Sequence, residues 1–326
     1  MSSEKTLNEV FSALSTRRRY EVWFVRLHLA DGSGAWWFRY LLLNPGRPPH
    51  ADVPQRMPVQ VWATWFPLNA RPTTIIQGFS LLDLDLSPRH RSPFHLLCSS
   101  NEITENGCRG SLENAGHKVS WELQYQSTFR VTLSDKGWIG FSRTPHSDAT
   151  FSGGITLDGQ TIDGTPLGYG LQGHNCGYRH RSFWLWAHAS FSPADAPTST
   201  LEALVYDMPI GMVFRKAVLW HNGRSEVFRN FKESLRDREN LCWEFAAIGS
   251  EGSRLEFFAD ARGPGIHRLS YEKTSHAGSF DVLNNSLSQA RIRLWHANGK
   301  REELETANGA VLEMAGNANP IPEVKQ

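Results

Sequence analysis

The chain has 326 residues, more than one domain usually holds, so its length predicts two domains with a core each. Its 34 Lys and Arg residues balance 33 Asp and Glu residues without a long run of either sign, which argues against nucleic acid and anionic membrane as partners. The N-terminus lacks the pattern of a signal peptide, and no stretch reaches the ~18 apolar residues of a membrane span. We therefore expect a cytoplasmic protein with no integral membrane segment.

Neither a metal nor a cofactor is predicted. Phosphate-binding glycine loops, the H-E-x-x-H motif and the G-x-S-x-G elbow are missing from the sequence. His174, His180 and His188 do not suggest a metal triad, because two of them flank a predicted turn and the third lies along a strand. Reduced thiols are expected for the four cysteines, which lack C-x-x-C spacing: Cys98, Cys108, Cys176 and Cys242.

The first predicted element is a short helix near the N-terminus. The residues from Thr6 to Glu9 fit the capping-box pattern. Apolar side chains then recur at helical spacing, at Leu7, Val10, Phe11 and Leu14. Such a helix is expected to cover one end of a sheet.

A β-hairpin is predicted next, because the apolar period changes to two from Tyr20 onward. The turn of the hairpin contains Asp31-Gly32. One face of the first strand carries Glu21, Trp23, Val25 and Leu27, and the second strand carries Trp36, Phe38 and Tyr40. The hairpin therefore places an acid on an aromatic face.

Further strands are expected through both halves of the chain, which favours an all-β protein. In the first half they cover 59–66, 74–79, 94–99, 109–113, 118–126, 129–133 and 150–157, with a proline-rich loop at 44–58. Turn signals at Asp158-Gly159 and Asp163-Gly164 place the domain boundary there, which gives domains 1–160 and 161–326. In the second half the strands cover 181–191, 200–206, 213–220, 224–231, 241–248, 254–259, 266–272, 279–283 and 291–296, with hairpin turns at Asn222-Gly223 and Asn298-Gly299. A helix is the expectation for 232–240.

The segment from Gly173 to His188 holds the densest mixture of polar and aromatic groups in the chain. As a strand from Arg181 onward, it projects Trp184, Trp186 and His188 from one face. Two indoles and an imidazole on one wall are typical of an apolar small-molecule pocket with a few polar handles.

Three short motifs in this order carry a resemblance to a known superfamily: Glu21-Val22-Trp23-Phe24, His174-Asn175-Cys176-Gly177 and Trp184-Leu185-Trp186-Ala187-His188. They resemble the lipocalin-like superfamily that includes carotenoid 1,2-hydratases (hydroxyneurosporene synthases), tocopherol cyclases and AttH-like proteins. The sequence departs from the superfamily at Val22 and Cys176, where Trp is common. The resemblance implies two tandem lipocalin-like antiparallel β-barrels over nearly the whole chain, with an apolar cavity, and chemistry that protonates or cyclises a polyene or prenyl chain.

These expectations define a candidate site. Protonation of an alkene needs a strong acid and shielding of the resulting carbocation, and aromatic faces stabilise a desolvated cation by up to ~2 kcal/mol. We expect a hydratase, cyclase or isomerase acting on a hydrophobic, alkene-containing small molecule. The catalytic candidates are Glu21, His174 and Asn175, and the substrate-binding candidates are Trp23, Trp37, Tyr178, Trp184, Trp186 and His188.

Other interpretations of the same residues stay open at this point. Glu21 pairs with Arg39 or Arg181 in one of them, and His174 and Asn175 cap a turn in another. The tryptophans then fill the barrels without contacting a ligand. At the level of function, the alternatives are a non-catalytic carrier of a hydrophobic molecule and a protein-interaction scaffold.

Overall fold

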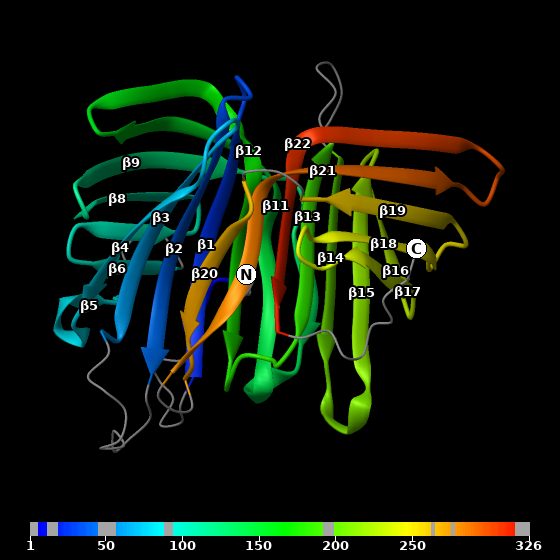
Figure 1. Ribbon diagram of the computed structural model, residues 1–326, viewed down its shortest axis with the longest axis horizontal. Coiled ribbons are helices and arrows are strands. Elements are labelled where there is room, and N and C mark those ends of the chain that lie inside the picture. Colours follow the sequence, from blue (N-terminus) through cyan, green and yellow to red (C-terminus); the bar gives the residue numbers. More distant parts are fainter. Residues whose placement is uncertain are drawn as a thin grey trace, which may run out of the picture. The chain divides into compact units, whose positions relative to one another are not determined.

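The computed structural model describes residues 6–11, 19–44, 57–87, 94–191, 199–261, 265–274 and 278–316. These residues form two antiparallel β-sheets with short 3₁₀ turns at Leu81–Asp83, Gly137–Ile139 and Pro209–Gly211 (Figure 1). The predicted all-β fold class is confirmed. None of the helical turns in the described ranges has the length and apolarity that crossing a bilayer would need.

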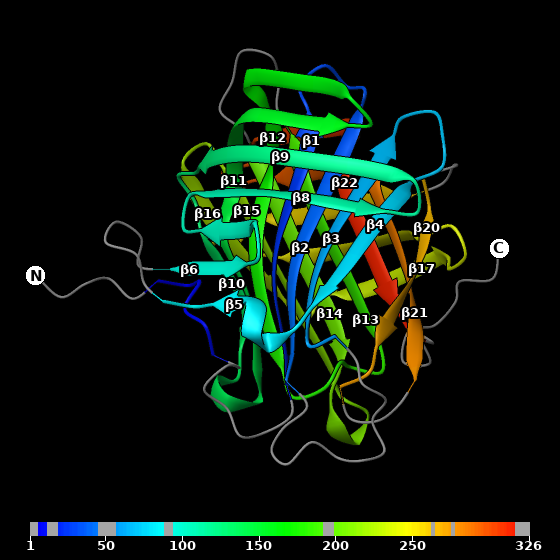
Figure 2. The same cartoon turned by 90° about the vertical axis from the view of Figure 1, so that its left-hand side faces the viewer.

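The first sheet runs in the order β4-β3-β2-β1-β12-β11-β9-β8-β7-β6-β5, and β10 pairs with β11. It curls on itself: β8 and β9 cross in front of β1 to β3 (Figure 2), and Asn114 at the end of β8 donates its side-chain N–H to the carbonyl of Ile76 on β4 at 2.8 Å. Its strands are β1 (Arg19–Leu29), β2 (Gly34–Asn44), β3 (Val59–Pro67), β4 (Thr73–Phe79), β5 (Leu84–Asp85), β6 (His95–Cys98), β7 (Asn101–Thr104), β8 (Gly107–Asn114), β9 (His117–Gln126), β10 (Val131–Asp135), β11 (Gly140–Leu157) and β12 (Gln160–Gly177).

The second sheet runs in the order β16-β15-β14-β13-β22-β21-β19-β18-β17, and β20 pairs with β21. An isolated bridge between Phe228 and Gly249 joins β16 to the end of β18, so this sheet curls as well. Its strands are β13 (Trp184–Phe191), β14 (Ser199–Asp207), β15 (Val213–His221), β16 (Arg224–Arg229), β17 (Lys232–Asp237), β18 (Cys242–Ile248), β19 (Arg254–Asp260), β20 (His267–Glu272), β21 (Ser279–Trp295) and β22 (Arg301–Ala315).

The chain divides into two compact units, and each sheet belongs mainly to one of them. Unit 1 comprises Met1–Trp65, Thr73–His180 and Glu272–Gly278, and unit 2 comprises Phe66–Pro72, Arg181–Tyr271 and Ser279–Gln326. Strand β12 pairs with β1 and β11 as far as Gly177, so the whole strand is part of the first sheet. Separate folding of two domains with a boundary at residue 160 stays a prediction.

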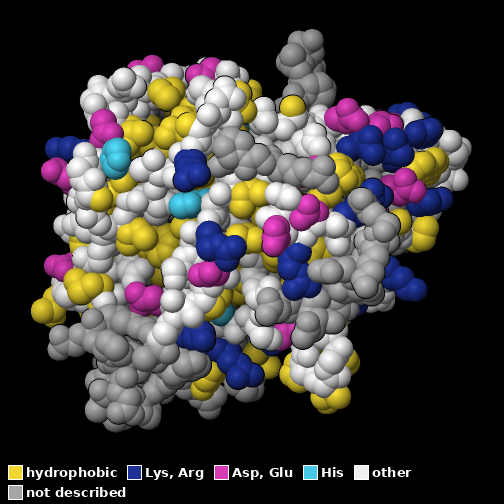
Figure 3. Space-filling model, in the orientation of Figure 1, with side chains coloured by type: hydrophobic (Ala, Val, Ile, Leu, Met, Phe, Trp, Pro, Cys, Tyr) yellow, Lys and Arg dark blue, Asp and Glu magenta, His cyan; other side chains and the backbone are white. Residues whose placement is uncertain are grey.

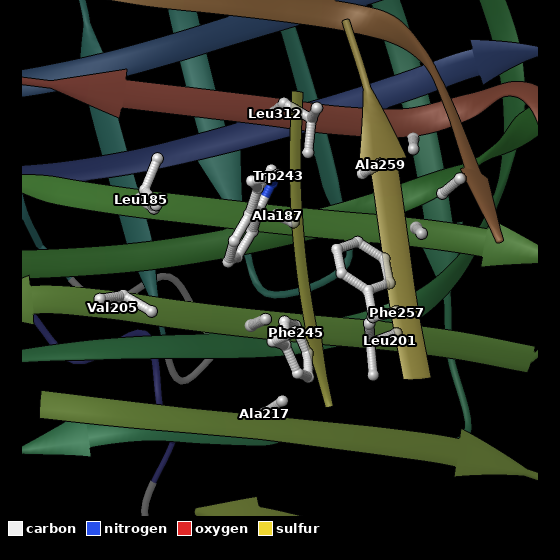
Figure 4. Packing of buried hydrophobic residues seen from close by; sticks show 14 of the residues in the cluster. Leu185, Ala187, Leu201, Val205, Ala217, Trp243, Phe245, Phe257, Ala259 and Leu312 are labelled. Atoms are coloured by element: carbon white, nitrogen blue, oxygen red, sulfur yellow. The ribbon is translucent and has the colours of Figure 1, made fainter. Parts of the chain in front are cut away.

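Each sheet buries one face in its own apolar core. In unit 1 this face carries Trp23, Val25 and Phe38 together with apolar side chains of β8 and β9. In unit 2 Leu185 and Ala187 of β13 face Trp243 on β18 (Figure 4). Burial of a large apolar side chain contributes about 1.5–3 kcal/mol, so these alternating positions are the main source of stability. Trp184, Trp186 and His188 share the opposite face of β13, as the alternation predicted.

Two local predictions were wrong. The described part of the predicted N-terminal helix, residues 6–11, contains a turn and no helix, and residues 12–14 lie outside the described residues. Of the segment 232–240, expected as a helix, residues 232–237 form strand β17 and residues 238–240 form a turn. Between His174 and His180, where a turn was expected, strand β12 ends at Gly177 and a bend follows at 178–179. Most of the predicted proline-rich loop, residues 45–56, lies outside the described residues.

Candidate functional site

Strands β1 and β12 bring the main candidates together. The two strands are antiparallel, with Trp23 opposite His174 and Glu21 opposite Cys176. Side chains two residues apart share a face, so Glu21, Trp23 and His174 all point toward the core of unit 1. Glu21 and His174 are diagonal neighbours in this register, a separation that long side chains can bridge.

A fully buried carboxylate–imidazole pair lies at the centre of this face. His174 Nε2 is 2.8 Å from Glu21 Oε1, and both side chains have 0% exposure. Trp23 stacks on the imidazole with ring centroids 4.6 Å apart and an interplanar angle of 14°. Phe141 contacts the same ring edge-on at 4.8 Å. The pair is therefore dry and aromatic-lined, as the sequence predicted for Glu21 and Trp23.

The hydrogen bonds of His174 define how many protons the pair holds. Its Nδ1 is 2.7 Å from the carbonyl oxygen of Leu7, and a carbonyl oxygen only accepts, so Nδ1 carries a hydrogen. One proton then lies between Nε2 and Glu21 Oε1, on either atom. Glu21 and His174 therefore share one proton, in addition to the hydrogen on Nδ1.

Residues 6–11, which we call the strap, cover this pair. The backbone N–H of Phe11 donates to Glu21 Oε1 at 2.8 Å and Oε2 at 3.1 Å. The indole N–H of Trp23 donates to the carbonyl oxygen of Asn8 at 3.1 Å. The side-chain amides of Asn8 and Gln172 exchange two hydrogen bonds, at 3.1 Å and 3.0 Å. Through these hydrogen bonds and that of the Leu7 carbonyl, the strap contacts four side chains of the site: Glu21, Trp23, Gln172 and His174.

Cys176 lies directly opposite Glu21 in the register of β1 with β12. Burial, followed by the nearby Glu21 carboxylate, raises the pKa of its thiol to about 12. A thiol in this state is neutral at ordinary pH and a poor nucleophile. The surroundings of Cys176 therefore do not activate its thiol as a nucleophile.

Two predicted site residues of unit 1 lie on the opposite face of the first sheet. Asn175 follows His174 along β12, and its buried Oδ1 has no hydrogen-bond partner among the described residues. Trp37 follows the core residue Trp36, and the guanidinium of Arg26 lies 3.9 Å from its ring centroid. Arg39, considered as a partner of Glu21, also lies on that opposite face, 4.9 Å from the Trp37 ring.

Tyr178 lies just beyond the end of β12, near the strap. The guanidinium of Arg19 is 5.2 Å from the centroid of its ring and 4.7 Å from that of Phe11. Arg19 thus lies against the aromatic rings of both Tyr178 and Phe11.

The remaining predicted residues belong to unit 2. Trp186 donates its indole N–H to Glu202 at 3.1 Å, and Trp184 donates to Glu313 at the same distance. Glu313 also accepts from the hydroxyl of Tyr271 at 3.3 Å. His188 is fully buried on the same face of β13. Both indoles of this predicted wall are thus fixed by carboxylates.

The sequence interpretation missed the strap and Gln172. Gln172 lies two residues before His174, so strand alternation would have placed it on the same face. The strap carried no such signal, because its contacts to Glu21 and His174 use backbone groups of Leu7 and Phe11. Across the described ranges, no group of three His, Cys, Asp or Glu side chains is arranged to hold a metal ion.

Comparison with known proteins supports the fold. The sequence matches no protein-family model and no curated protein. Kievitone hydratase from Nectria haematococca has a similar structure, with a TM-score of 0.52 at 10% identity over 93% of this chain and 90% of that chain. A putative AttH from Nitrosomonas europaea gives 0.51 at 12% identity over 92% of both chains. CghA gives 0.57 at 11% identity over 95% of this chain and 90% of that chain. The chain therefore shares the lipocalin-like fold that its motifs predicted.

Proposed function

We propose that this protein is a cofactor-independent hydratase, cyclase or isomerase that acts on a hydrophobic, alkene-containing small molecule of terpenoid, carotenoid or polyketide type. The Glu21–His174 pair is the proton donor, and Trp23 is its aromatic wall. The observation that carries the proposal is a buried carboxylate–imidazole pair with one transferable proton, stacked against an indole.

The chemistry of the site supports proton transfer to carbon. An alkene carbon is a weak base, so it is protonated only by an acid that is shielded from water, which would otherwise take the proton. Both side chains of the pair are excluded from solvent. The carbocation that forms is stabilised by aromatic faces, by up to ~2 kcal/mol when desolvated. Trp23 and Phe141 supply two such rings within 5 Å of the imidazole. Water, a hydroxyl of the substrate or loss of a different proton then completes hydration, cyclisation or isomerisation.

The structural neighbours add support at the level of reaction class. One of the similar structures is named as a hydratase. Low sequence identity means that this likeness supports the fold and the choice of candidate reactions, while the site residues above support the mechanism. Asn175 and Trp37, on the other face of the sheet, take no part in the proton transfer that we propose. Tyr178, Trp184, Trp186 and His188 remain proposed ligand contacts.

Proton transfer to carbon is testable with deuterium. The purified protein is incubated in D₂O with lipid extract and with defined polyenes, and the products are analysed by mass spectrometry. Cyclisation or isomerisation through protonation gives a product with one carbon-bound deuterium, and hydration adds one water with a deuterium on carbon. Glu21→Gln is expected to lower turnover by at least about 100-fold, the usual contribution of a general acid.

A second carboxylate–imidazole pair provides the matched control. His95 Nε2 is 2.8 Å from Glu102 Oε1, and its Nδ1 is 3.0 Å from the carbonyl oxygen of Ser87. Glu102→Gln removes a comparable buried pair and is expected to leave turnover unchanged in protein that remains folded. Equal turnover in Glu21→Gln, Glu102→Gln and the native protein would reject our assignment of the acid.

A carrier of hydrophobic molecules is the second candidate, favoured by the complete burial of Glu21 and His174. In this case the aromatic groups bind the ligand and no proton moves. The same incubation separates the two functions, because a carrier returns its bound ligand unchanged and free of carbon-bound deuterium.

A further inference from the structure

The strap leaves no free approach to the proton of the Glu21–His174 pair. Trp23 and Phe141 cover a face and an edge of the imidazole, and both ring nitrogens are engaged. The N–H of Phe11 approaches both carboxylate oxygens of Glu21. Behind Trp23 the core is filled, since Phe94 stacks on the indole at 5.3 Å. Among the described residues, the amide of Phe11 thus lies against the carboxylate that a substrate atom would have to reach.

The outer side of the strap faces solvent. Phe11 is 38% exposed, and Glu9 is exposed as well. Phe11 thus contacts Glu21 through its backbone while part of its side chain is exposed to solvent. Side-chain contacts also hold it. The amides of Asn8 and Gln172 exchange two hydrogen bonds, the hydroxyl of Thr6 donates to Glu105 at 2.6 Å, and the ring of Phe11 lies against Phe141 and Arg19.

The same backbone groups have an alternative partner. In an α-helix the carbonyl oxygen of Leu7 accepts from the N–H of Phe11, four residues later. In the structure the carbonyl accepts from His174 and the N–H donates to Glu21. When the strap leaves the pair, these two groups can bond to each other, as the helical pattern of the sequence favours. The Leu7 carbonyl and the Phe11 N–H therefore have a hydrogen-bond partner in either arrangement.

We propose that the strap is a displaceable part of the site, with Asn8 and Gln172 as positioning residues that latch it closed. In the closed arrangement the Leu7 carbonyl holds His174 with the hydrogen on Nδ1. An apolar ligand displaces Phe11 from Glu21 and occupies the space beside Trp23. The role of this motion in catalysis rests on the proposed function. The motion itself is proposed independently of that function.

The latch is tested by chemical modification of His174 with diethyl pyrocarbonate, quantified by mass spectrometry of the peptide that contains it. The reagent needs an imidazole nitrogen with a free lone pair, which the closed strap withholds. Asn8→Ala is expected to raise the modification rate about tenfold, the change in an opening equilibrium that one or two lost hydrogen bonds produce. Asn114→Ala is the matched control, because it removes a side-chain amide hydrogen bond at the end of β8, far from the strap in sequence. It is expected to leave the modification rate of His174 unchanged.

Rescue and spectroscopy separate a latch from a general loss of stability. The exchanged pair, Asn8→Gln with Gln172→Asn, restores two amide hydrogen bonds and returns the rate to the native value. In ¹⁵N-histidine spectra His174 of the native protein carries hydrogen on Nδ1, and Asn8→Ala reduces that signature. Phe11→Pro, which removes the N–H donated to Glu21 together with the ring that contacts Arg19 and Phe141, provides a second way to open the strap if Asn8→Ala does not fold.

The outcomes distinguish the two proposals. A native modification rate in both Asn8→Ala and Phe11→Pro overturns the strap, whatever the turnover. A raised rate in both variants, combined with no deuterium transfer to any alkene, supports the strap and counts against the proposed enzyme.

Discussion

His174 and His95 make the same two kinds of hydrogen bond, yet their carboxylate partners differ in what else they contact. Arg109 donates its Nε–H to Glu102 Oε2 at 2.6 Å, which places a cation beside that carboxylate. The corresponding oxygen of Glu21 accepts from the backbone N–H of Phe11. A guanidinium thus fixes Glu102, and the backbone amide of Phe11, which we propose to be displaceable, covers Glu21. This difference is the reason for choosing Glu102 as the control.

His146 predicts a pH dependence of stability. Burial lowers the pKa of its imidazole. Its Nε2 is 2.8 Å from the carbonyl oxygen of Glu105, and its Nδ1 is 2.8 Å from the Ser127 hydroxyl, so the neutral ring suits both partners. Below the usual histidine pKa of about 6.5 the unfolded chain binds a proton that the native state does not, and stability falls as pH falls, by at most ~1.4 kcal/mol per pH unit.

The measurement is the free energy of unfolding in urea at pH 7.5 and pH 5.5. His146→Gln is expected to be less stable at pH 7.5 and to lose less on acidification than the native protein. An identical pH dependence in both proteins would exclude His146 as the source.

Ile210 predicts a gain in stability on substitution. It lies at the tip between β14 and β15 with φ 64° and ψ 31°, and it is 95% exposed. A β-branched side chain in the left-handed region costs about 1–2 kcal/mol, and Asn tolerates that region. Ile210→Asn is therefore expected to raise the free energy of unfolding by about 1 kcal/mol. Ile248→Asn, an exposed position in strand β18, is the control and gives no such gain.

At the level of elements, glycines allow β12 to lie close to β1. A Cβ added at Gly170 would be 1.9 Å from the carbonyl oxygen of Arg26, so backbone atoms would have to move. Gly170→Ala is expected to destabilise the protein by about 1–3 kcal/mol, the usual cost of overpacking. Gly154→Ala in the adjacent strand is the control, because its Cβ would meet only an ordinary contact at 3.4 Å. Equal melting temperatures for the two variants would contradict this role of Gly170.

Strands with clear alternation were predictable from the sequence, and segments that depend on distant partners were not. The β1–β2 hairpin and the Asn222-Gly223 turn follow local rules, and both glycine-containing turns have the positive φ that such hairpins need. The predicted N-terminal helix failed because the i to i+4 partners Leu7 and Phe11 bond to His174 and Glu21 instead. For 232–240, pairing with β18 decided the outcome over local pattern.

On the scale of the whole molecule, charges of both signs are interspersed on the face shown in Figure 3. Across β21 and β22, for example, Arg291 and Arg293 lie within 4 Å of Glu303. Exposed pairs of this kind contribute little stability, at most about 1 kcal/mol each, and are screened by salt. Because the net charge is only +1 and both signs occur on this face, we expect no strong field that would steer a charged ligand, which suits the apolar substrate that we propose.

The pairing of Glu21 with His174 could not be predicted from local sequence patterns. Glu21 and His174 were each predicted as acids, but they are 153 residues apart, and only the register of β1 with β12 makes them neighbours. Strand pairing between distant segments depends on the whole sheet, so composition and periodicity identify candidate residues without saying which of them meet. Strands β11 and β12 form one hairpin across residue 160, and the predicted domain boundary at that residue stays a prediction.

The four cysteines offer a test of the two-domain organisation. All four are free and buried, with Cys98, Cys108 and Cys176 in unit 1 and Cys242 in unit 2. Burial raises the pKa of Cys98, Cys108 and Cys176 to about 12, so the native thiols are expected to react slowly with alkylating reagents. Pulsed alkylation along a urea series, read by mass spectrometry of each cysteine peptide, then reports the unfolding of each unit. If the units are separate domains, the three thiols of unit 1 become reactive together and Cys242 at a different urea concentration. A single transition for all four would mean that the two sheets unfold as one cooperative structure.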